Sequence, residues 1–199
     1  MKRDVVGVVL AGGTSRRMGR DKALLEIEGS ALVDRAAAVL AVFCEPVVLS
    51  VAPGRRYPKS PFLPVEDERD DSGPLAGFEA VLDWARPRAV LVLACDLPRI
   101  DEPVVERLLR AREQEGPTSG VEAWVACRGE RLQPLCGLYE SSCLAAFRNQ
   151  LDRGELSVLT AVEALDCHYV PYDDIHPDPF LNLNTPADYA RAGSEVVAR

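Results

Sequence analysis

Apolar runs of strand length alternate with longer stretches of helical periodicity along this 199-residue chain. The strand-like runs occupy residues 5–10, 47–51, 62–65, 89–94, 122–127 and 135–139. Helical patterns occupy residues 30–41, 74–84, 101–112 and 141–151, and a capping pattern at Thr185 predicts the start of a last helix. Strands that alternate with helices in this way form a sheet covered by helices on both faces. The sequence therefore predicts a three-layer α/β/α fold with a mostly parallel central sheet.

Composition and charge narrow the class of protein. With 47% hydrophobic residues the chain can bury a substantial core, and we expect residues 1–199 to form a single domain. No apolar run is long enough to span a membrane and the run at 5–10 is too short for a secretion signal, so we expect a cytoplasmic protein that binds no membrane. Six cysteines occur without a C-x-x-C pair, which predicts reduced, mostly buried thiols rather than a zinc site. The net charge of −8 disfavours nucleic-acid binding but allows a small phosphorylated ligand at a local basic cluster.

The first strand-like run leads into a glycine pair and a cluster of basic residues. Gly12 and Gly13 follow Leu10 and Ala11 at the end of the run. Four basic side chains then fall within seven positions: Arg16, Arg17, Arg20 and Lys22. The glycine spacing matches neither the P-loop nor the dinucleotide fingerprint, which argues against a nicotinamide-dependent dehydrogenase. The stretch is compatible with a polyphosphate site at the end of a parallel strand, or with a plain turn that has a solvated basic rim.

Asp96 follows the most continuous apolar run, at residues 89–94. An ionised carboxylate at the end of a buried strand needs a cation partner, and Mg²⁺ that also binds phosphate oxygens is a suitable one. An aspartate at this position is also compatible with a structural role, because it could cap the turn before Pro98.

A third segment, Gly73-Pro74-Leu75-Ala76-Gly77, follows the acidic pair Glu66-Asp67. Pro74 is typical of the first turn of a helix, and the free amides at that end can bind an anion or the edge of a base. The same spacing is equally compatible with a plain loop before a helix in which Gly77 is a packing contact.

Four motifs, in order along nearly the whole chain, resemble those of the MobA-like nucleotidyltransferases, which attach a nucleotide to the molybdenum cofactor: LAGGTSRRMGRDK, ED…GPLAG, CDLP and NLNTPAD. The resemblance implies a Rossmann-like fold of the nucleotide-diphospho-sugar transferase type, with the nucleotide bound in the N-terminal half and the acceptor in the C-terminal half. It implies an Mg²⁺-dependent enzyme that transfers GMP from GTP to the terminal phosphate of molybdopterin, or of its molybdenum-bearing form, and releases pyrophosphate. It also implies transient contact with cofactor-biosynthesis or molybdoenzyme partners.

The resemblance further implies roles for individual residues. Arg17 and Lys22 would neutralise charge on the phosphates and Asp96 would hold Mg²⁺, so these three are the catalytic candidates. Asp67 would accept hydrogen bonds from the N1–H and N2–H₂ groups of guanine, a donor pair that cytosine lacks. Asn182 would contact the acceptor. The residues expected to bind the nucleotide are Leu10, Ala11, Gly12, Gly13, Lys22, Ser50, Asp67, Gly73, Pro74, Leu75 and Asp96.

Ser50 departs from the family, whose members often have asparagine at this position. A serine keeps one hydrogen bond with the base but not the paired donor and acceptor of an amide. One alternative function is therefore a cytidylyltransferase of the same superfamily, which makes a molybdopterin cytosine dinucleotide or another nucleotide-activated small molecule, although the LAGG sequence and Asp67 favour guanine. A second alternative is a non-catalytic nucleotide-binding adaptor, but that function would not explain why Lys22 and Asp96 both occur.

Overall fold

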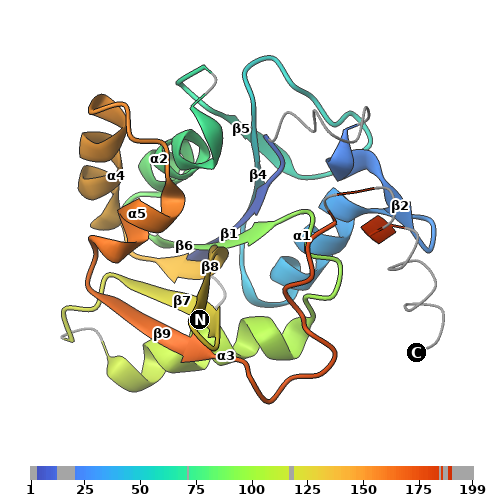
Figure 1. Ribbon diagram of the computed structural model, residues 1–199. Helices are drawn as coiled ribbons and strands as arrows, with labels where there is room; N and C mark the ends of the chain where they lie inside the picture. Colours follow the sequence, from blue (N-terminus) through green and yellow to red (C-terminus); the bar gives the residue numbers. More distant parts are fainter. Residues whose placement is uncertain are drawn as a thin grey trace.

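The computed structural model describes residues 4–12, 21–70, 72–116, 119–183, 185 and 188–189 of the chain. At their centre lies a seven-stranded sheet (Figure 1). In spatial order its strands are β5 (Leu63–Glu66), β4 (Val47–Val51), β1 (Val5–Leu10), β6 (Ala89–Ala94), β8 (Arg131–Tyr139), β7 (Ala123–Arg128) and β9 (Cys167–Pro171). β8 is antiparallel to both of its neighbours, whereas the other pairs of neighbouring strands are parallel. The predicted mostly parallel sheet is confirmed.

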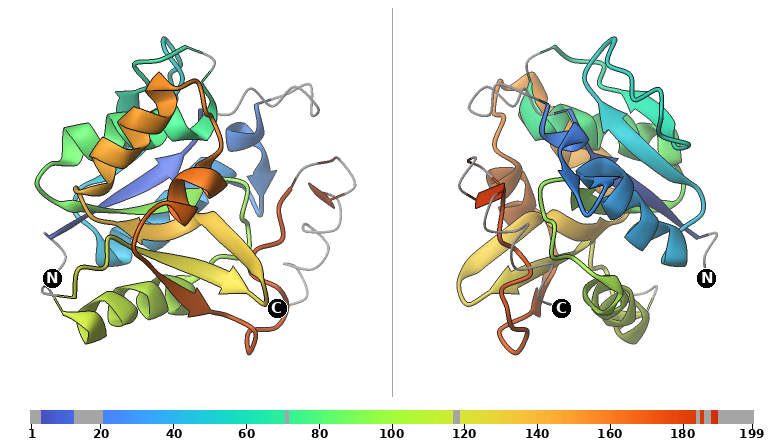
Figure 2. Two further views of the ribbon diagram at one scale, coloured as in Figure 1. Left: turned by 60° about the vertical axis from the view of Figure 1, so that its left-hand side comes forward. Right: turned by 90° about the vertical axis from the view of Figure 1, so that its right-hand side faces the viewer.

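Helices cover both faces of this sheet (Figures 1 and 2). The helices are α1 (Leu32–Phe43) and α3 (Glu102–Glu115) on one face, and α2 (Gly73–Ala85), α4 (Cys143–Asp152) and α5 (Val158–Glu163) on the other. Successive side chains of a strand point to opposite faces, so β6 contributes to both cores. Leu91 and Leu93 pack with α1 and α3, whereas Val90 and Val92 pack with α2, α4 and α5. The structure thus has the predicted three layers.

The bounds of the predicted strands agree closely with the structure. The edge strand β9, which pairs with β7, and helix α5 were not predicted. Strands β1, β4 and β6 coincide with the predicted runs, and β5 and β7 begin one residue later. β8 begins at Arg131 rather than at residue 135, because it continues directly from a hairpin with β7. The prediction of a helix from residue 30 was wrong for its first two residues: β3 (Ser30–Ala31) pairs antiparallel with β2 (Glu26–Ile27), and α1 begins only after this pairing ends.

The start of a last helix at Thr185 is confirmed. Oγ1 of Thr185 accepts a hydrogen bond from the N–H of Asp188 at 3.2 Å, and Oδ2 of Asp188 accepts one from the N–H of Thr185 at 2.9 Å. This reciprocal pair is a capping box, in which each residue satisfies a backbone donor of the other. Pro186 and residues 190–199 lie outside the described part of the chain.

The six cysteines are free thiols; four of them are buried and two are partly exposed. The two partly exposed cysteines are Cys95, which follows β6, and Cys167, the first residue of β9. No helix in the described part of the chain has both the length and the apolar character needed to cross a bilayer.

Candidate active site

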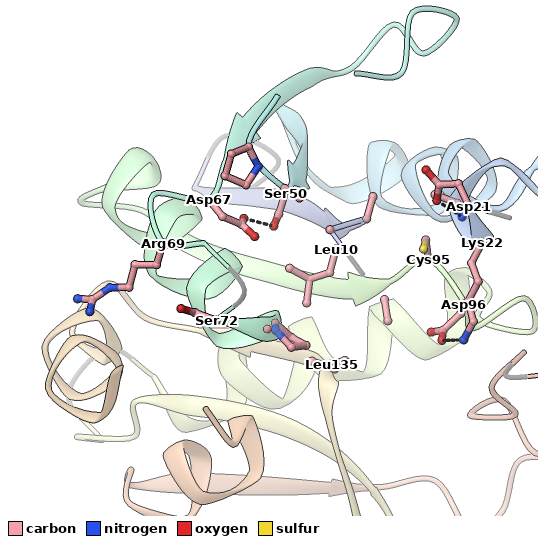
Figure 3. Close-up of a pocket in the computed structure, with 18 residues that line it drawn as sticks. Leu10, Asp21, Lys22, Ser50, Asp67, Arg69, Ser72, Cys95, Asp96 and Leu135 are labelled. Atoms are coloured by element: carbon pink, nitrogen blue, oxygen red, sulfur yellow. Dashed lines mark hydrogen bonds and ion pairs between the residues drawn. The ribbon is translucent and has the colours of Figure 1, made fainter. Parts of the chain in front are cut away.

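A cleft of about 480 Å³ opens at the carboxyl edge of the sheet, beside the ends of β1, β4 and β6 (Figure 3). Leu10 of β1 is paired with Ser50 of β4 on one side and with Ala94 of β6 on the other. The loops that follow these strands therefore leave the sheet at the same level, as is usual for ligand sites of parallel sheets. The predicted site residues that line the cleft are Leu10, Ala11, Gly12, Lys22, Ser50, Asp67, Gly73, Pro74 and Asp96.

One end of the cleft is built around Asp67, which follows β5. Its N–H donates to the backbone oxygen of Val51 at 2.9 Å, which extends the pairing of β4 with β5 by one residue. The Oγ of Ser50, a residue that is only 1% exposed, donates to Oδ1 of Asp67 at 3.2 Å. Burial raises the pKa of Asp67 to about 6, against the lowering effect of the Ser50 hydrogen bond. A carboxylate removed from water in this way is suited to a ligand that offers N–H donors.

Two glycines provide the space that Ser50 and Asp67 occupy. A Cβ on Gly77 would lie 2.5 Å from Oγ of Ser50 and 3.4 Å from Oδ1 of Asp67. A Cβ on Gly12 would lie 3.3 Å from Oδ2 of Asp67. Because a carbon and an oxygen cannot approach to 2.5 Å without a shift, Gly77 is what allows α2 to pack directly on this pair. Gly77 is therefore a packing contact, and the packing it permits forms a wall of the cleft.

The other end of the cleft carries Lys22 and Asp96, across from Asp67 in Figure 3. Lys22 is the first residue of η1 (Lys22–Leu24), a short 3₁₀-helix that begins after Asp21. Its Nζ lies 3.3 Å from Oδ2 of Asp96, and the two side chains are 18% and 21% exposed. The structure thus brings two of the predicted catalytic residues together. Such a pair offers an ammonium to phosphate oxygens and a carboxylate to the cation that accompanies them.

The donor set around Asp96 limits how a metal could bind. Among the described residues, no three His, Cys, Asp or Glu side chains converge in a way that would hold a metal ion. Mg²⁺ in nucleotide-dependent enzymes is usually held by one or two carboxylates, and phosphate oxygens and waters complete its shell. Asp96 is sufficient for that mode of binding but not for a site made of protein ligands alone. The residues therefore fit Mg²⁺ that is bound jointly with a nucleotide.

The N-terminus of α2 lies at the edge of the cleft. Gly73 and Pro74 line the cleft, and the N-cap residue Ser72 makes no side-chain capping bond to the first amides of the helix. Leu75 is fully buried, and its side chain lies in the core that α2 shares with α4 rather than in the cleft. The expected contact between Leu75 and a nucleotide could therefore involve only its backbone.

The segment that contains Asn182 lies beside Asp96, but Asn182 itself does not line the cleft. The N–H of Leu183 donates to the backbone oxygen of Asp96 at 3.1 Å, which places the segment that contains Asn182 beside the end of β6. Gly13 and Arg17 fall outside the residues that the structure describes. The roles of these three residues stay predictions.

The cleft is also lined by residues that the sequence analysis did not select: Asp21, Ala23, Ala52, Pro53, Arg69, Ser72, Ala94, Cys95 and Leu135. The guanidinium of Arg69 points away from the middle of the cleft in Figure 3. Its Nε and Nη2 donate to the two carboxylate oxygens of Glu79 at 2.7 and 3.1 Å, and Nη2 also donates to Asp152 at 2.7 Å. Glu79 is buried and accepts a further hydrogen bond from Arg148 at 3.1 Å. Arg69 therefore ties the β5–α2 loop to α2 and α4.

Replacing Arg69 by alanine is expected to lower the melting temperature more than Arg110→Ala does. The first change leaves the buried carboxylate of Glu79 with Arg148 as its remaining partner, and a buried charge that loses a partner is strongly unfavourable. Arg110 pairs with Glu106 on the exposed side of α3, where such pairs contribute little. Thermal unfolding of both variants and of the wild type checks this, and equal melting temperatures for the two variants would contradict the role given to Arg69.

A family model described as the MobA-like NTP transferase domain matches residues 7–167. The chain belongs to the MobA-like NTP transferase family. The match extends from β1 to the first residue of β9, so it contains Lys22, Asp67 and Asp96. The resemblance inferred from the four motifs is confirmed.

Similar proteins match this chain over nearly its whole length. The molybdenum cofactor guanylyltransferase of Rhodobacter capsulatus is 36% identical over 195 residues, which are 94% of each protein. The molybdenum cofactor guanylyltransferase of Syntrophotalea carbinolica is 32% identical over 189 residues, which cover 92% of this chain and 88% of the relative.

Solved structures confirm the type of fold. Molybdopterin-guanine dinucleotide biosynthesis protein A from Archaeoglobus fulgidus superposes with a TM-score of 0.78 at 24% identity. The superposition covers 98% of this chain and 100% of the Archaeoglobus chain. The 2-C-methyl-D-erythritol 4-phosphate cytidylyltransferase from Thermus thermophilus superposes with a TM-score of 0.69 at 18% identity, with 96% and 98% covered. Because proteins named for guanine and for cytidine nucleotides share this fold, nucleotide preference must be argued from the site residues.

Proposed function

We propose that this protein transfers GMP from GTP to the terminal phosphate of molybdopterin, or of its molybdenum-bearing form, and releases pyrophosphate. The observation that carries the proposal is the placement of Asp67 at one end of the cleft and of the Lys22–Asp96 pair at the other. The names of the two relatives, which match nearly the whole chain, support it. Transient contact with cofactor-biosynthesis or molybdoenzyme partners is part of the same proposal.

The Asp67 end of the cleft favours guanine over cytosine. An ionised carboxylate can accept hydrogen bonds from both N1–H and N2–H₂ of guanine, whereas cytosine has no such adjacent donor pair. The hydrogen bond from Ser50 at 3.2 Å fixes the orientation of the Asp67 carboxylate before a base arrives. A group that is already oriented loses less conformational freedom on binding, which favours affinity. In this arrangement Ser50 supports the carboxylate rather than reading the base itself.

The Lys22–Asp96 end suits the transfer chemistry. An oxygen of the acceptor phosphate attacks the α-phosphorus in line and pyrophosphate leaves, so the protein needs to supply positioning and charge neutralisation rather than a nucleophile. Lys22, together with Arg17, would stabilise the negative charge that grows on the leaving pyrophosphate. Asp96 would hold Mg²⁺, which when bound supplies further charge neutralisation at the α-phosphate.

Guanine binding is expected to weaken in acid because the pKa of Asp67 is raised to about 6. Below that pH the free protein carries a protonated carboxyl, and binding of the base must first displace this proton. Below about pH 6 the affinity for guanosine should therefore fall about tenfold for each unit by which the pH is lowered. At higher pH, where the carboxylate is ionised, the affinity should be constant. Guanosine is the ligand to titrate because it has no phosphate that ionises in this range. The Asp67→Asn variant cannot titrate at this position, so the same pH dependence in that variant would assign the effect to another group.

Pyrophosphate release tests the proposed function. We expect the protein to release pyrophosphate from GTP only when molybdopterin and Mg²⁺ are both present, and to act far more slowly on CTP. Faster release with CTP would support the cytidylyltransferase alternative, which the departure of Ser50 from the usual asparagine leaves open. GTP binding without pyrophosphate release for any acceptor would support the adaptor alternative.

A further inference from the structure

Two side chains of the β4–β5 loop contact the segment that carries Lys22. The guanidinium of Arg55 forms an ion pair with Oδ2 of Asp21 through Nη1. The hydroxyl oxygen of Tyr57 lies 3.2 Å from the same Oδ2 and 2.9 Å from the backbone oxygen of Ala11. Tyr57 is only 8% exposed, so these contacts are shielded from water. One loop thus reaches both the end of β1 and the residue before Lys22.

Asp21 connects these contacts to Lys22 through η1. Its Oδ1 accepts a hydrogen bond from the N–H of Ala23 at 3.1 Å, and its backbone oxygen accepts one from Leu24 at 3.2 Å. Asp21 is therefore the N-cap of this short helix, and an N-cap fixes how the first helical residues leave it. Lys22 is the first of these residues, and its Nζ reaches Oδ2 of Asp96 at 3.3 Å. One carboxylate oxygen of Asp21 is held by the β4–β5 loop, and the other holds η1.

The hydroxyl of Tyr57 stays protonated and can therefore act as a hydrogen-bond donor at any ordinary pH. Burial, with a further contribution from the charge of Asp21, raises the pKa of Tyr57 well above its usual range, so the hydroxyl keeps its proton. That single proton can be donated either to Ala11 or to Asp21, and Arg55 supplies the second donor that Asp21 needs. Removal of the hydroxyl takes this donor away from the backbone oxygen of Ala11 or from the carboxylate of Asp21, both shielded from water, which is unfavourable.

We propose that Tyr57 and Arg55 are positioning residues for Lys22 in nucleotidyl transfer. They hold Asp21, Asp21 sets the start of η1, and η1 directs the Lys22 ammonium toward Asp96 and the phosphates. Neither Tyr57 nor Arg55 lines the cleft, so they act on the nucleotide through Lys22 rather than by direct contact. The inference rests on the proposed function, since it concerns the lysine assigned to the triphosphate.

Tyr57→Phe tests this role because it removes the hydroxyl and keeps the ring that packs in the core. We expect the affinity for GTP to fall about tenfold, since the hydroxyl that contacts both Ala11 and Asp21 is lost and Lys22 is held less firmly. The affinity for guanosine should be unchanged, because guanosine offers Lys22 no phosphate. Isothermal titration calorimetry with GTP and with guanosine measures both values, and an unchanged GTP affinity would overturn the proposal.

Tyr172→Phe is the matched control. Tyr172 is fully buried, its hydroxyl donates to the backbone oxygen of Val104 at 2.7 Å, and it does not line the cleft. This variant therefore loses a comparable buried hydrogen bond and should show a similar fall in melting temperature. It should bind GTP and guanosine as the wild type does. A loss of GTP affinity equal to that of Tyr57→Phe would assign the effect to general destabilisation and overturn the positioning role.

A double-mutant cycle with Lys22→Ala separates positioning from any other effect on GTP binding. We expect Lys22→Ala alone to weaken GTP binding, and the addition of Tyr57→Phe to weaken it no further because the lysine to be positioned is gone. Additive losses in the double variant would overturn the proposal. Wild-type protein that binds GTP but releases no pyrophosphate would refute the proposed function and leave this cycle interpretable, whereas wild-type protein that does not bind GTP would overturn both.

Discussion

Asp96→Asn is expected to lower kcat for guanylyl transfer by roughly a hundredfold to a thousandfold, the range typical for loss of one group that stabilises charge in the transition state. The amide keeps the shape of the side chain but removes the negative charge that would hold Mg²⁺. The fold should persist, because the ion pair of Asp96 with Lys22 is partly exposed and such pairs contribute little to stability. Pyrophosphate release and circular dichroism, measured on the same preparation, give the two readouts.

Asp174→Asn provides the control for this experiment. Asp174 pairs with Arg107 at 2.7 Å and does not line the cleft. Its replacement removes one negative charge and one ion pair, as Asp96→Asn does, and should leave turnover at the wild-type rate. Near-normal turnover in Asp96→Asn would exclude this carboxylate from the mechanism.

Asp67→Asn is expected to change which base the protein prefers. Guanine offers two donors to the Asp67 carboxylate. In the Asp67→Asn variant the N–H₂ group of the asparagine would face one of these donors, so that donor would have no acceptor. Xanthine has N1–H next to a carbonyl at position 2, so the asparagine oxygen and N–H₂ group can pair with both. We therefore expect the affinity of the variant for GTP to fall about a hundredfold, because unpaired buried donors are strongly unfavourable. The variant should bind xanthosine triphosphate more tightly than GTP.

Direct titration of the two nucleoside triphosphates checks the change in preference. The phosphates are identical in GTP and xanthosine triphosphate, so any difference between them reports on the base alone. Asp67→Ala serves as a control, since it cannot pair with either base and should bind both weakly. An Asp67→Asn variant that keeps the wild-type preference for GTP would show that the base is recognised elsewhere.

The central strands could be predicted to the residue because burial on both faces makes them continuous apolar runs. β1, β4 and β6 are buried along their whole length. The hairpin of β2 and β3 was missed because each strand has only two residues, too few for periodicity to appear. The start of β8 was missed because its first residues are partly exposed and form no apolar run.

The main cleft residues could be predicted because parallel strands bring their carboxyl ends together. Contacts between side chains far apart in the sequence could not. Tyr57 reaches Ala11 across 46 residues and Arg69 reaches Asp152 across 83, and both contacts depend on how loops fold over the sheet. Leu75 shows a further limit: its position in a motif did not indicate that its side chain points into the core.

Guanine-specific nucleotidyl transfer is tested most directly by competition. The protein is given molybdopterin, Mg²⁺ and equal concentrations of GTP and CTP, and mass spectrometry identifies the dinucleotide that forms. We expect molybdopterin guanine dinucleotide as the main product, with one pyrophosphate released for each molecule made. A cytosine dinucleotide as the main product would contradict the assignment of Asp67 to guanine, and no dinucleotide from a protein that binds GTP would contradict the transfer itself.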